Sequence, residues 1–360
     1  MKSHLTLLLC TLMLATATSY AQIENNIVIT DAIDNFTLIP NKEGNAIEFI
    51  KRTITKNFMA TRAPTTAIDY VFYDSFTKIN KVNVKAKGVK PIYGSAISAG
   101  VFYDDSKVCI VNVPLDEINK PVETRFEVTQ SRPDFEPVIY LGDRYPIKKC
   151  VTKITMPLAF EDRLDIIVSN VDDNVQITRS ISKNGRDWEI TVLSQDLPAL
   201  ESPKDAPPSR YIYPKIQFVG QFANPQELYT RLREFTLQPD PDPAAVEAKA
   251  LEITTGLDSD STRIEAIYNW VHENIRYVAI EHGDLGNTPD HASEVLRKRY
   301  GDCKGSANLI KAMLNSIGLD GRLVWIGTNS IPDDYTDLPV FATGNHMIAA
   351  VRLPGDSLVY

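Results

Sequence analysis

The chain has 360 residues, of which 43% are hydrophobic and 23% are charged, so it can form the cores of two ordinary domains and is not disordered throughout. Its formal net charge is −8, and it contains no run of basic residues. This charge balance argues against nucleic acid and against anionic membrane surfaces as partners.

The first 21 residues have the pattern of a signal peptide, which would be removed from the mature protein. Lys2 supplies a positive start, residues 5–15 are apolar, and Ser19-Tyr20-Ala21 fits a cleavage site between small residues. The apolar run is shorter than the about 20 residues that span a bilayer, and no later stretch is apolar enough to do so. We therefore predict a signal peptide at 1–21, no membrane span, and an exported bacterial protein, periplasmic or extracellular, with the cell envelope as one such location. A retained N-terminal anchor is the alternative.

The mature chain keeps three cysteines, at positions 109, 150 and 303. An odd number of cysteines in an oxidising compartment indicates a free thiol. Cys109 and Cys150 both lie in strand-like segments of the N-terminal half, and a disulfide between them would leave Cys303 free. Spacing alone does not decide this pairing, because it depends on the distance between the two residues in the fold.

From Ile23 to about Phe218 the dominant pattern is the alternation of apolar and polar residues that is typical of half-buried strands. Asn184-Gly185 is the strongest hairpin signal. We predict an antiparallel, sandwich-like all-β domain over residues 22–237, without a catalytic constellation, because it has no histidine and no metal-ligand spacing. The strongest strand-forming segments are 67–73, 107–113, 147–156, 164–168 and 188–192.

A proline-rich stretch then separates this half from a segment with a helical period. Its alternate prolines fix φ and keep the preceding residues out of the helical region, so we predict a semi-rigid linker at 238–243. Asp242 is expected to cap, and Pro243 to open, a helix through about Ile253. Ser261 is predicted to cap a second helix, whose apolar face comprises Ile264, Ile267, Val271 and Ile275.

The segment from Tyr300 to Gly305 is typical of a sharp turn that places Cys303 on the first turn of a helix. Asp302 is a suitable N-cap and Gly318 a suitable stop. The positive end of the helix dipole favours the thiolate, which is a nucleophile. A buried structural cysteine is the alternative. The helix is expected to bury Ala307, Ile310, Leu314 and Ile317 on the face of Cys303.

A base for this thiol is available at His346, which opens a predicted strand ending at Arg352. Acyl transfer by a cysteine needs a thiolate, an imidazole that shares its proton and an acceptor that orients the imidazole. Alternation puts His346, Ile348 and Ala350 on one face of the strand, and the thiol and imidazole can touch if that face meets the Cys303 helix. A hydrogen-bonded core histidine is the alternative.

Three segments resemble the transglutaminase-like (papain-like) cysteine superfamily. Gly301-Asp302-Cys303-Lys304, before a helix rich in Ala, Leu and Ile, resembles the nucleophile segment. The stretch 292–297 resembles the short helix that leads into it, and Asn345 to Val351 resembles the strand that carries the family histidine. The sequence departs from the family at Gly305, where many bacterial members have an acid. The resemblance covers about residues 245–360.

The resemblance implies an α+β transglutaminase-like core at 244–360 in which Cys303 and His346 are catalytic. Tyr277 lies where the family has an aromatic oxyanion donor or tunnel wall, with a packing tyrosine as the alternative. The family acid follows on the next strand, just past Tyr360, so we expect the core to be incomplete at its C-terminal end. Alternatives within the chain are Asp333, Asp334, Asp337 and Asp356.

The stretch from Trp188 to Pro203, with Pro198-Ala199-Leu200-Glu201, resembles the β-rich domain of unknown function 3857 that often precedes such cores in exported bacterial proteins.

Together these features predict an exported thiol acyl-transfer enzyme that acts on an amide of a peptide or protein. Transfer of the acyl group to water gives a cysteine protease or amidase, and transfer to an amine gives a transglutaminase-type acyltransferase. We expect no cofactor and no metal, because His282, Asp284, Asp290 and His291 do not have a metal-ligand spacing. A catalytically silent binding or scaffold protein of the same fold is the alternative.

Overall fold

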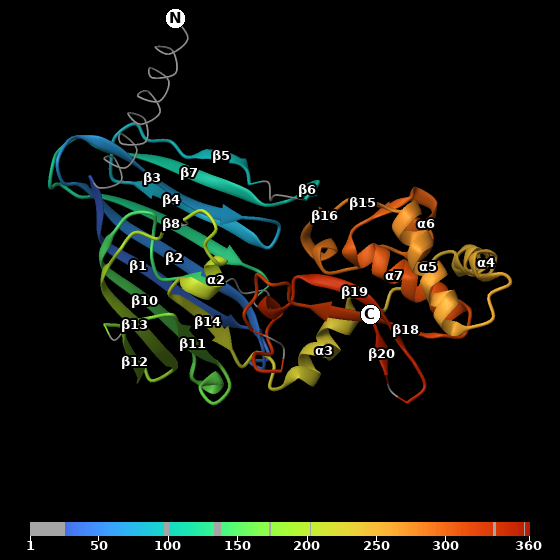
Figure 1. Cartoon of the computed structure of the whole chain (residues 1–360). Helices are drawn as coiled ribbons and strands as arrows, with labels where there is room; N and C mark the ends of the chain where they lie inside the picture. Colours follow the sequence, from blue (N-terminus) through green and yellow to red (C-terminus); the bar gives the residue numbers. More distant parts are fainter. Residues whose placement is uncertain are drawn as a thin grey trace, which may run out of the picture. The chain divides into compact units, whose positions relative to one another are not determined.

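The chain folds into two compact units, seen here in a computed structural model (Figure 1). The structure describes residues 26–96, 101–132, 138–172, 174–201, 203–333, 336–355 and 357–360. The predicted signal peptide lies outside these ranges. The first unit comprises the chain up to Ser95 and Lys107–Phe218, and the second comprises Ala96–Ser106 and Val219–Tyr360.

A seven-stranded sheet forms the main layer of the first unit, in the order β12-β13-β10-β1-β2-β8-β4. The prediction of a purely antiparallel domain is wrong at its centre, because β1 and β10 pair in parallel. The other neighbours are antiparallel, including the predicted hairpin of β12 and β13 around Asn184-Gly185. The strands are β1 (Ile27–Pro40), β2 (Ile47–Ala60), β4 (Thr77–Val84), β8 (Val122–Gln130), β10 (Ile147–Pro157), β12 (Gln176–Ile181) and β13 (Asp187–Leu197).

Two three-stranded sheets complete the first unit. Their orders are β3-β7-β5 and β11-β14-β9. All five segments with the strongest predicted strand pattern are strands in the structure. The remaining elements are β3 (Thr65–Tyr73), β5 (Ile92–Ser95), β7 (Lys107–Leu115), β9 (Ile139–Tyr140), β11 (Asp165–Ser169), β14 (Lys215–Val219), η2 (Leu158–Phe160) and the one-turn helix α2 (Ser209–Ile212).

Two hydrophobic clusters fill this unit. One joins the seven-stranded sheet to β3 and β7, and its largest fully buried members are Phe58 and Phe126. The other joins the same sheet to β11 and β14 through residues such as Ile154 and Ile216.

Cys109 and Cys150 both lie in the first cluster and are free thiols rather than a disulfide. Burial raises the pKa of both thiols, to about 12 for Cys150, so neither is a thiolate at neutral pH.

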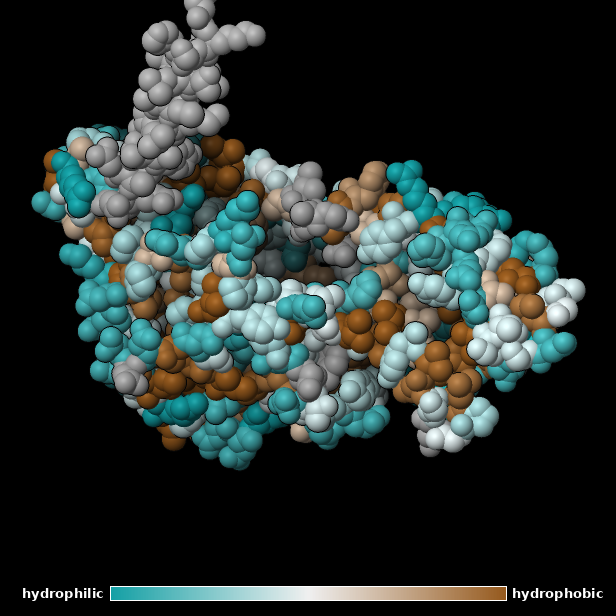
Figure 2. All heavy atoms as spheres, in the orientation of Figure 1, coloured by the Kyte–Doolittle hydropathy of each residue, from teal (hydrophilic) through white to brown (hydrophobic). Residues whose placement is uncertain are grey.

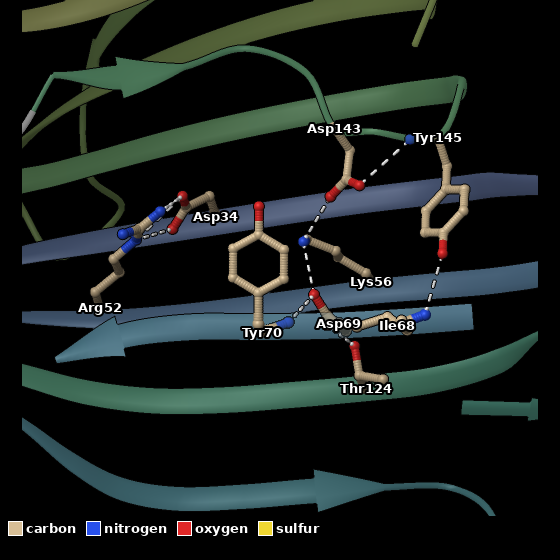
Figure 3. A network of polar contacts seen from close by, with 9 residues as sticks. All are labelled: Asp34, Arg52, Lys56, Ile68, Asp69, Tyr70, Thr124, Asp143 and Tyr145. Carbon is tan, nitrogen blue, oxygen red and sulfur yellow. Dashed lines mark hydrogen bonds and ion pairs between the residues drawn. The ribbon is translucent and has the colours of Figure 1, made fainter. Parts of the chain in front are cut away.

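A buried ionic network crosses the sheets of the first unit (Figure 3). The ammonium of Lys56 on β2 lies 2.7 Å from Asp69 on β3 and 2.7 Å from Asp143 in the loop after β9. Thr124 on β8 donates to the second oxygen of Asp69 at 2.5 Å. Burial alone would lower the pKa of Lys56, but the two carboxylates raise it above its ordinary value, so the ammonium stays charged.

The second unit combines helices with a small antiparallel sheet, β18-β19-β20. Two short parallel pairs, β15 with β17 and β16 with β6, lie beside the helices. The elements are α3 (Pro225–Glu234), α4 (Pro243–Thr254), α5 (Asp260–Asn274), α6 (Ala292–Lys298), α7 (Cys303–Ser316), η3 (Gly283–Gly286), η4 (Phe341–Thr343), β6 (Tyr103–Asp104), β15 (Arg276–Tyr277), β16 (Ile280–Glu281), β17 (Tyr300–Gly301), β18 (Asp320–Ile326), β19 (His346–Arg352) and β20 (Leu358–Val359).

Helix α7 is the centre of the second unit, because it contacts α4, α5 and α6 as well as β18 and β19. It therefore buries two faces rather than the one predicted, and Leu309 and Met313 are as fully buried as Leu314. The predicted cap of α5 is also wrong by two residues. Ser259, not Ser261, accepts a hydrogen bond from the N–H of Thr262, because α5 begins at Asp260, two residues before the start that a cap at Ser261 implies.

The face of the molecule drawn in Figure 2 is mostly hydrophilic, with hydrophobic residues gathered in smaller groups. Such groups are normal on protein surfaces, where apolar atoms make up more than half of the exposed area. Within the residues that the structure describes, no helix is long and apolar enough to cross a membrane.

Candidate functional site

The N-terminus of α7 holds Cys303 as its first residue, as the sequence predicts. Asp302 is the N-cap, and its Oδ1 accepts a hydrogen bond from the N–H of Gly305 at 2.8 Å. Its other oxygen, Oδ2, pairs with the ammonium of Lys304. Lys304 is buried, with a side chain only 3% exposed. The cysteine is therefore held between the two members of a buried ion pair.

Two glycines let this turn pack closely against α6. A Cβ at Gly301 would lie 3.2 Å from Cγ1 of Val295, and a Cβ at Gly305 would lie 3.2 Å from Cγ2 of the same residue. The Gly305 position is also 3.5 Å from Cβ of Asp290 and from Oδ1 of Asp302. Many bacterial members of the superfamily that this segment resembles have an acid at this position. Here an acid would need Val295 to move and would place a carboxylate beside Asp302.

The thiol of Cys303 faces the strand that carries His346. Backbone N–H groups of Met347, on β19, and of Lys304 hydrogen-bond to the sulfur. Burial nevertheless raises the pKa of the Cys303 thiol above its ordinary value; those two hydrogen bonds and the Lys304 charge oppose this effect, while Asp302 adds to it. The helix dipole alone would lower the pKa of this thiol, but the loss of water around the partly buried sulfur has the larger effect.

His346 is the first residue of β19 and is half-buried. Its strand partner is Ile326, the last residue of β18. The preceding residue, Asn345, fixes the entry to the strand. Its Oδ1 accepts from the N–H of Thr328 at 2.9 Å, and its amide nitrogen donates to the hydroxyl of Thr328 at 2.9 Å. The structure therefore brings Cys303 to the backbone of the residue that follows His346.

Tyr277 lies on β15, directly across from Gly301 on β17. The N–H of Val278 donates to the carbonyl of Gly301 at 3.0 Å, which ties this strand to the turn of Cys303. Tyr277 is 57% exposed. Its backbone thus lies one strand away from the turn that positions the thiol.

The remaining acidic and histidine candidates are spread over the second unit. Asp333 and Asp337 lie in the loop before η4, while Asp334 and Asp356 are outside the described residues. His282 stacks on Tyr103, and His291 is the N-cap residue of α6. The side chain of Asp284 is outside the described part. Among the side chains that are described, no group of three or more His, Cys, Asp or Glu residues is arranged to hold a metal ion.

Sequence reasoning missed one polar residue that supports the site. The α6 helix has no side-chain cap from its own N-cap residue. Instead, Oδ2 of Asp240, in the proline-rich stretch, accepts from the N–H of Ser293 at 3.0 Å. This contact spans the chain from the predicted linker to the helix that leads into the Cys303 turn. No local signal reports it, because the two residues are far apart in sequence.

Comparison with known proteins agrees with this description of the second unit. Residues 247–359 match the family described as the transglutaminase-like superfamily. No curated protein matches the chain. A solved structure of a proposed protease from Parabacteroides distasonis ATCC 8503 is similar, with a TM-score of 0.65 and 15% sequence identity over 93% of this chain and 67% of that chain. At this identity the similarity shows the fold alone.

Two other solved structures have TM-scores too low to show a shared fold. A proposed cysteine protease from Cytophaga hutchinsonii has a TM-score of 0.26 and 12% identity over 91% of this chain and 76% of that chain. An M1 zinc metallopeptidase from Deinococcus radiodurans has a TM-score of 0.29 and 12% identity over 53% of this chain and 42% of that chain. The chain thus carries a transglutaminase-like domain at residues 247–359, within a fold that it shares with the proposed protease from Parabacteroides distasonis.

Proposed function

We propose that the chain is an exported thiol acyl-transfer enzyme that acts on amide bonds of a peptide or protein. The observation that carries this proposal is the contact between the Cys303 sulfur and the backbone of Met347, which follows His346 on β19. The match of residues 247–359 to the transglutaminase-like superfamily supports the same chemistry.

In the proposed reaction Cys303 is the nucleophile and His346 the general base. The thiol gives its proton to the imidazole, and the sulfur forms a bond to the carbonyl carbon of the amide. The C–N bond then breaks, and the amine or ammonia leaves with the proton held by His346. Water or a second amine attacks the thioester, releases the acyl product and restores the thiol.

The oxyanion of the intermediate needs donors that are already in place. The backbone N–H of Cys303 is one, because the first N–H groups of a helix have no partner within the helix. The hydroxyl of Tyr277 is the second proposed donor, since its strand pairs with Gly301. Peptide hydrolysis and amine transfer share this machinery and differ only in what attacks the thioester.

The proposed domain organisation adds three parts to this core. A signal peptide at 1–21 directs export to the periplasm or the exterior of a bacterium. A sandwich-like β-domain over 22–237, of the type named domain of unknown function 3857, precedes the linker at 238–243. The transglutaminase-like core over 244–360 follows the linker.

One observation favours a second candidate, a catalytically silent binding or scaffold protein. Burial raises the pKa of the Cys303 thiol, which opposes thiolate formation in the absence of a charged partner. The two candidates therefore differ in whether His346 activates the thiol.

The test is the rate at which iodoacetamide alkylates Cys303, measured by mass spectrometry against pH. In the His346→Ala variant the imidazole is lost and burial remains, so the half-maximal rate should move to a higher pH, above the ordinary thiol value of about 8.5. His272→Ala, on the exposed end of α5, is the matched control and should leave the profile unchanged. Identical profiles for the wild type and His346→Ala, or an unreactive thiol in both, would leave the scaffold candidate.

A further inference from the structure

An excursion of the chain between β5 and β7 belongs to the second unit. Its ends are joined by a hydrogen bond from the N–H of Ala96 to the carbonyl of Ser106 at 2.9 Å. Within it, β6 pairs in parallel with β16, and Figure 1 shows the two strands side by side. The N–H groups of Phe102 and Tyr103 both donate to the carbonyl of Ala279, at 2.9 and 3.3 Å. The excursion is thus fixed to the segment that follows Tyr277.

The aromatic side chains of this excursion are exposed to solvent. Phe102 is 78% exposed, the highest value among the exposed large hydrophobic residues of the described chain, and Tyr103 is 50% exposed. The ring of Tyr103 stacks on His282 with centroids 6.2 Å apart and an angle of 17° between the planes. An isolated exposed aromatic residue needs no explanation, but an exposed phenylalanine next in sequence to a tyrosine that stacks on a histidine offers apolar rings suited to ligand contact.

Two backbone pairings connect this surface to the turn that carries Cys303. Tyr277 pairs with Gly301, which precedes Cys303 by two residues, and Ala279 holds the excursion. Neighbouring strands are about 4.8 Å apart and residues rise about 3.3 Å along a strand. The aromatic surface is therefore within the span of about three or four residues of an extended peptide whose carbonyl lies at Cys303.

We propose that Phe102, Tyr103 and His282 form a specificity subsite for an aromatic or large apolar side chain of a peptide substrate, about two to four residues from the amide that Cys303 attacks. The inference rests on the proposed function and names its substrate class. It also gives the excursion from the β-rich half a role in the reaction, because the excursion supplies part of the substrate surface. A side chain that covers these rings removes apolar area from water, which a glycine at the same position does not do.

The test compares two peptidyl fluoromethyl ketones of equal length, one with phenylalanine and one with glycine at the third residue from the reactive carbon. The second-order rate of Cys303 labelling is measured by mass spectrometry in the full chain. In the wild type the phenylalanine probe should label at least about tenfold faster, the discrimination typical of one apolar group in a pocket. In the double variant Phe102→Ser/Tyr103→Ser this ratio should fall close to one.

Tyr268→Ser is the matched control. Tyr268 is also an exposed tyrosine, at 55%, that stacks on a histidine of the same unit, His272, at 6.1 Å and 22°. It lies on α5 and should leave the ratio unchanged. The iodoacetamide rate of Cys303 reports the intact nucleophile in every variant, and Phe102→Tyr/Tyr103→Phe should keep the discrimination.

The outcomes separate this inference from the proposed function. If Cys303 reacts with iodoacetamide at the same rate in all variants but the probe ratio is equal in the wild type and the double variant, the subsite is overturned and the proposed enzyme stands. If Cys303 reacts with neither the probes nor iodoacetamide in the wild type, the proposed function is overturned and the subsite with it.

Discussion

The nucleophile proposed here is flanked by two oppositely charged side chains. Asp302 and Lys304 pair with each other on either side of Cys303, and their side chains are 11% and 3% exposed. Burial raises the pKa of the thiol, and the Lys304 charge acts in the opposite direction. Lys304 therefore has two effects: it neutralises a buried carboxylate and it favours the thiolate.

Replacing Lys304 by methionine should expose both effects. Without the ammonium the pKa of Cys303 rises further, so the half-maximal rate of alkylation by iodoacetamide should shift to higher pH. The free energy of unfolding in urea should fall by about 3–5 kcal/mol, because Asp302 keeps a buried charge without its partner.

Lys298→Met serves as the control for this variant. Lys298 pairs with Glu294 on α6 at 3.6 Å with 31% of its side chain exposed, so its removal should lower the free energy of unfolding far less than the removal of Lys304. A Lys304→Met protein with the wild-type pH profile would show that the ion pair supports the fold but does not tune the thiol.

At the scale of elements, α6 depends on a cap from outside its own sequence. Asp240 is partly buried, which by itself raises the pKa of its carboxyl; hydrogen bonds from Ser293 and Asp242 and the charge of His291 outweigh this and lower the pKa. A carboxyl with a lowered pKa in the folded state stabilises that state when it is ionised. The contribution is full above the unfolded value of about 3.9 and is lost as the pH falls through the lower folded value.

The variant Asp240→Ala should lower the free energy of unfolding at pH 7 by about 1 kcal/mol, the usual cost of a lost N-cap. The difference from the wild type should shrink as the pH falls below about 4, because the wild type then loses the same interaction. Urea unfolding at a series of pH values measures this. Asp258→Ala, at an exposed position before α5, is the control for the loss of a surface carboxylate.

Local signals account for most elements of the second unit. The Asp302 cap, the start of α7 at Cys303 and the strand from His346 to Arg352 all follow from short-range patterns and are confirmed. The inward position of Lys304 and the cap of α6 by Asp240 could not be predicted in this way. A lysine is normally exposed, and the Asp240 contact joins residues that only the tertiary fold brings together.

The same limit applies to the whole chain. Alternation predicted the strands of the first unit, but the parallel pairing of β1 with β10 depends on register between distant segments. No sequence pattern predicts the excursion at 96–106 either, because the partner of its strand, β16, lies in the other half of the chain. The pairing of strands and the assignment of segments to units are non-local properties, which composition and periodicity do not encode.

Lys56 shows how one such non-local residue joins a whole unit. It lies on β2 of the seven-stranded sheet, and its partners Asp69 and Asp143 come from a second sheet and from the loop after a strand of the third (Figure 3). Asp69 is only 1% exposed and is also held by the hydroxyl of Thr124. The ammonium is therefore the counter-charge for two carboxylates that the fold has removed from water.

Lys56→Met should lower the free energy of unfolding of the first unit by about 3–5 kcal/mol, because both carboxylates lose their partner while they remain in a poorly hydrated site. Tryptophan fluorescence and circular dichroism during urea unfolding measure the change. Lys85→Met is the control. The Lys85 side chain is 63% exposed and pairs with Glu123, so its removal should lower the free energy of unfolding by at most about 1 kcal/mol.

The triple variant Lys56→Met/Asp69→Asn/Asp143→Asn decides why stability is lost. It removes the two uncompensated charges as well as the ammonium, so it should be more stable than Lys56→Met alone. If the triple variant is instead less stable than the single variant, the carboxylates stabilise the unit through their other hydrogen bonds, such as those from Thr124 and from the N–H of Tyr70, and the role of Lys56 as their counter-charge is wrong.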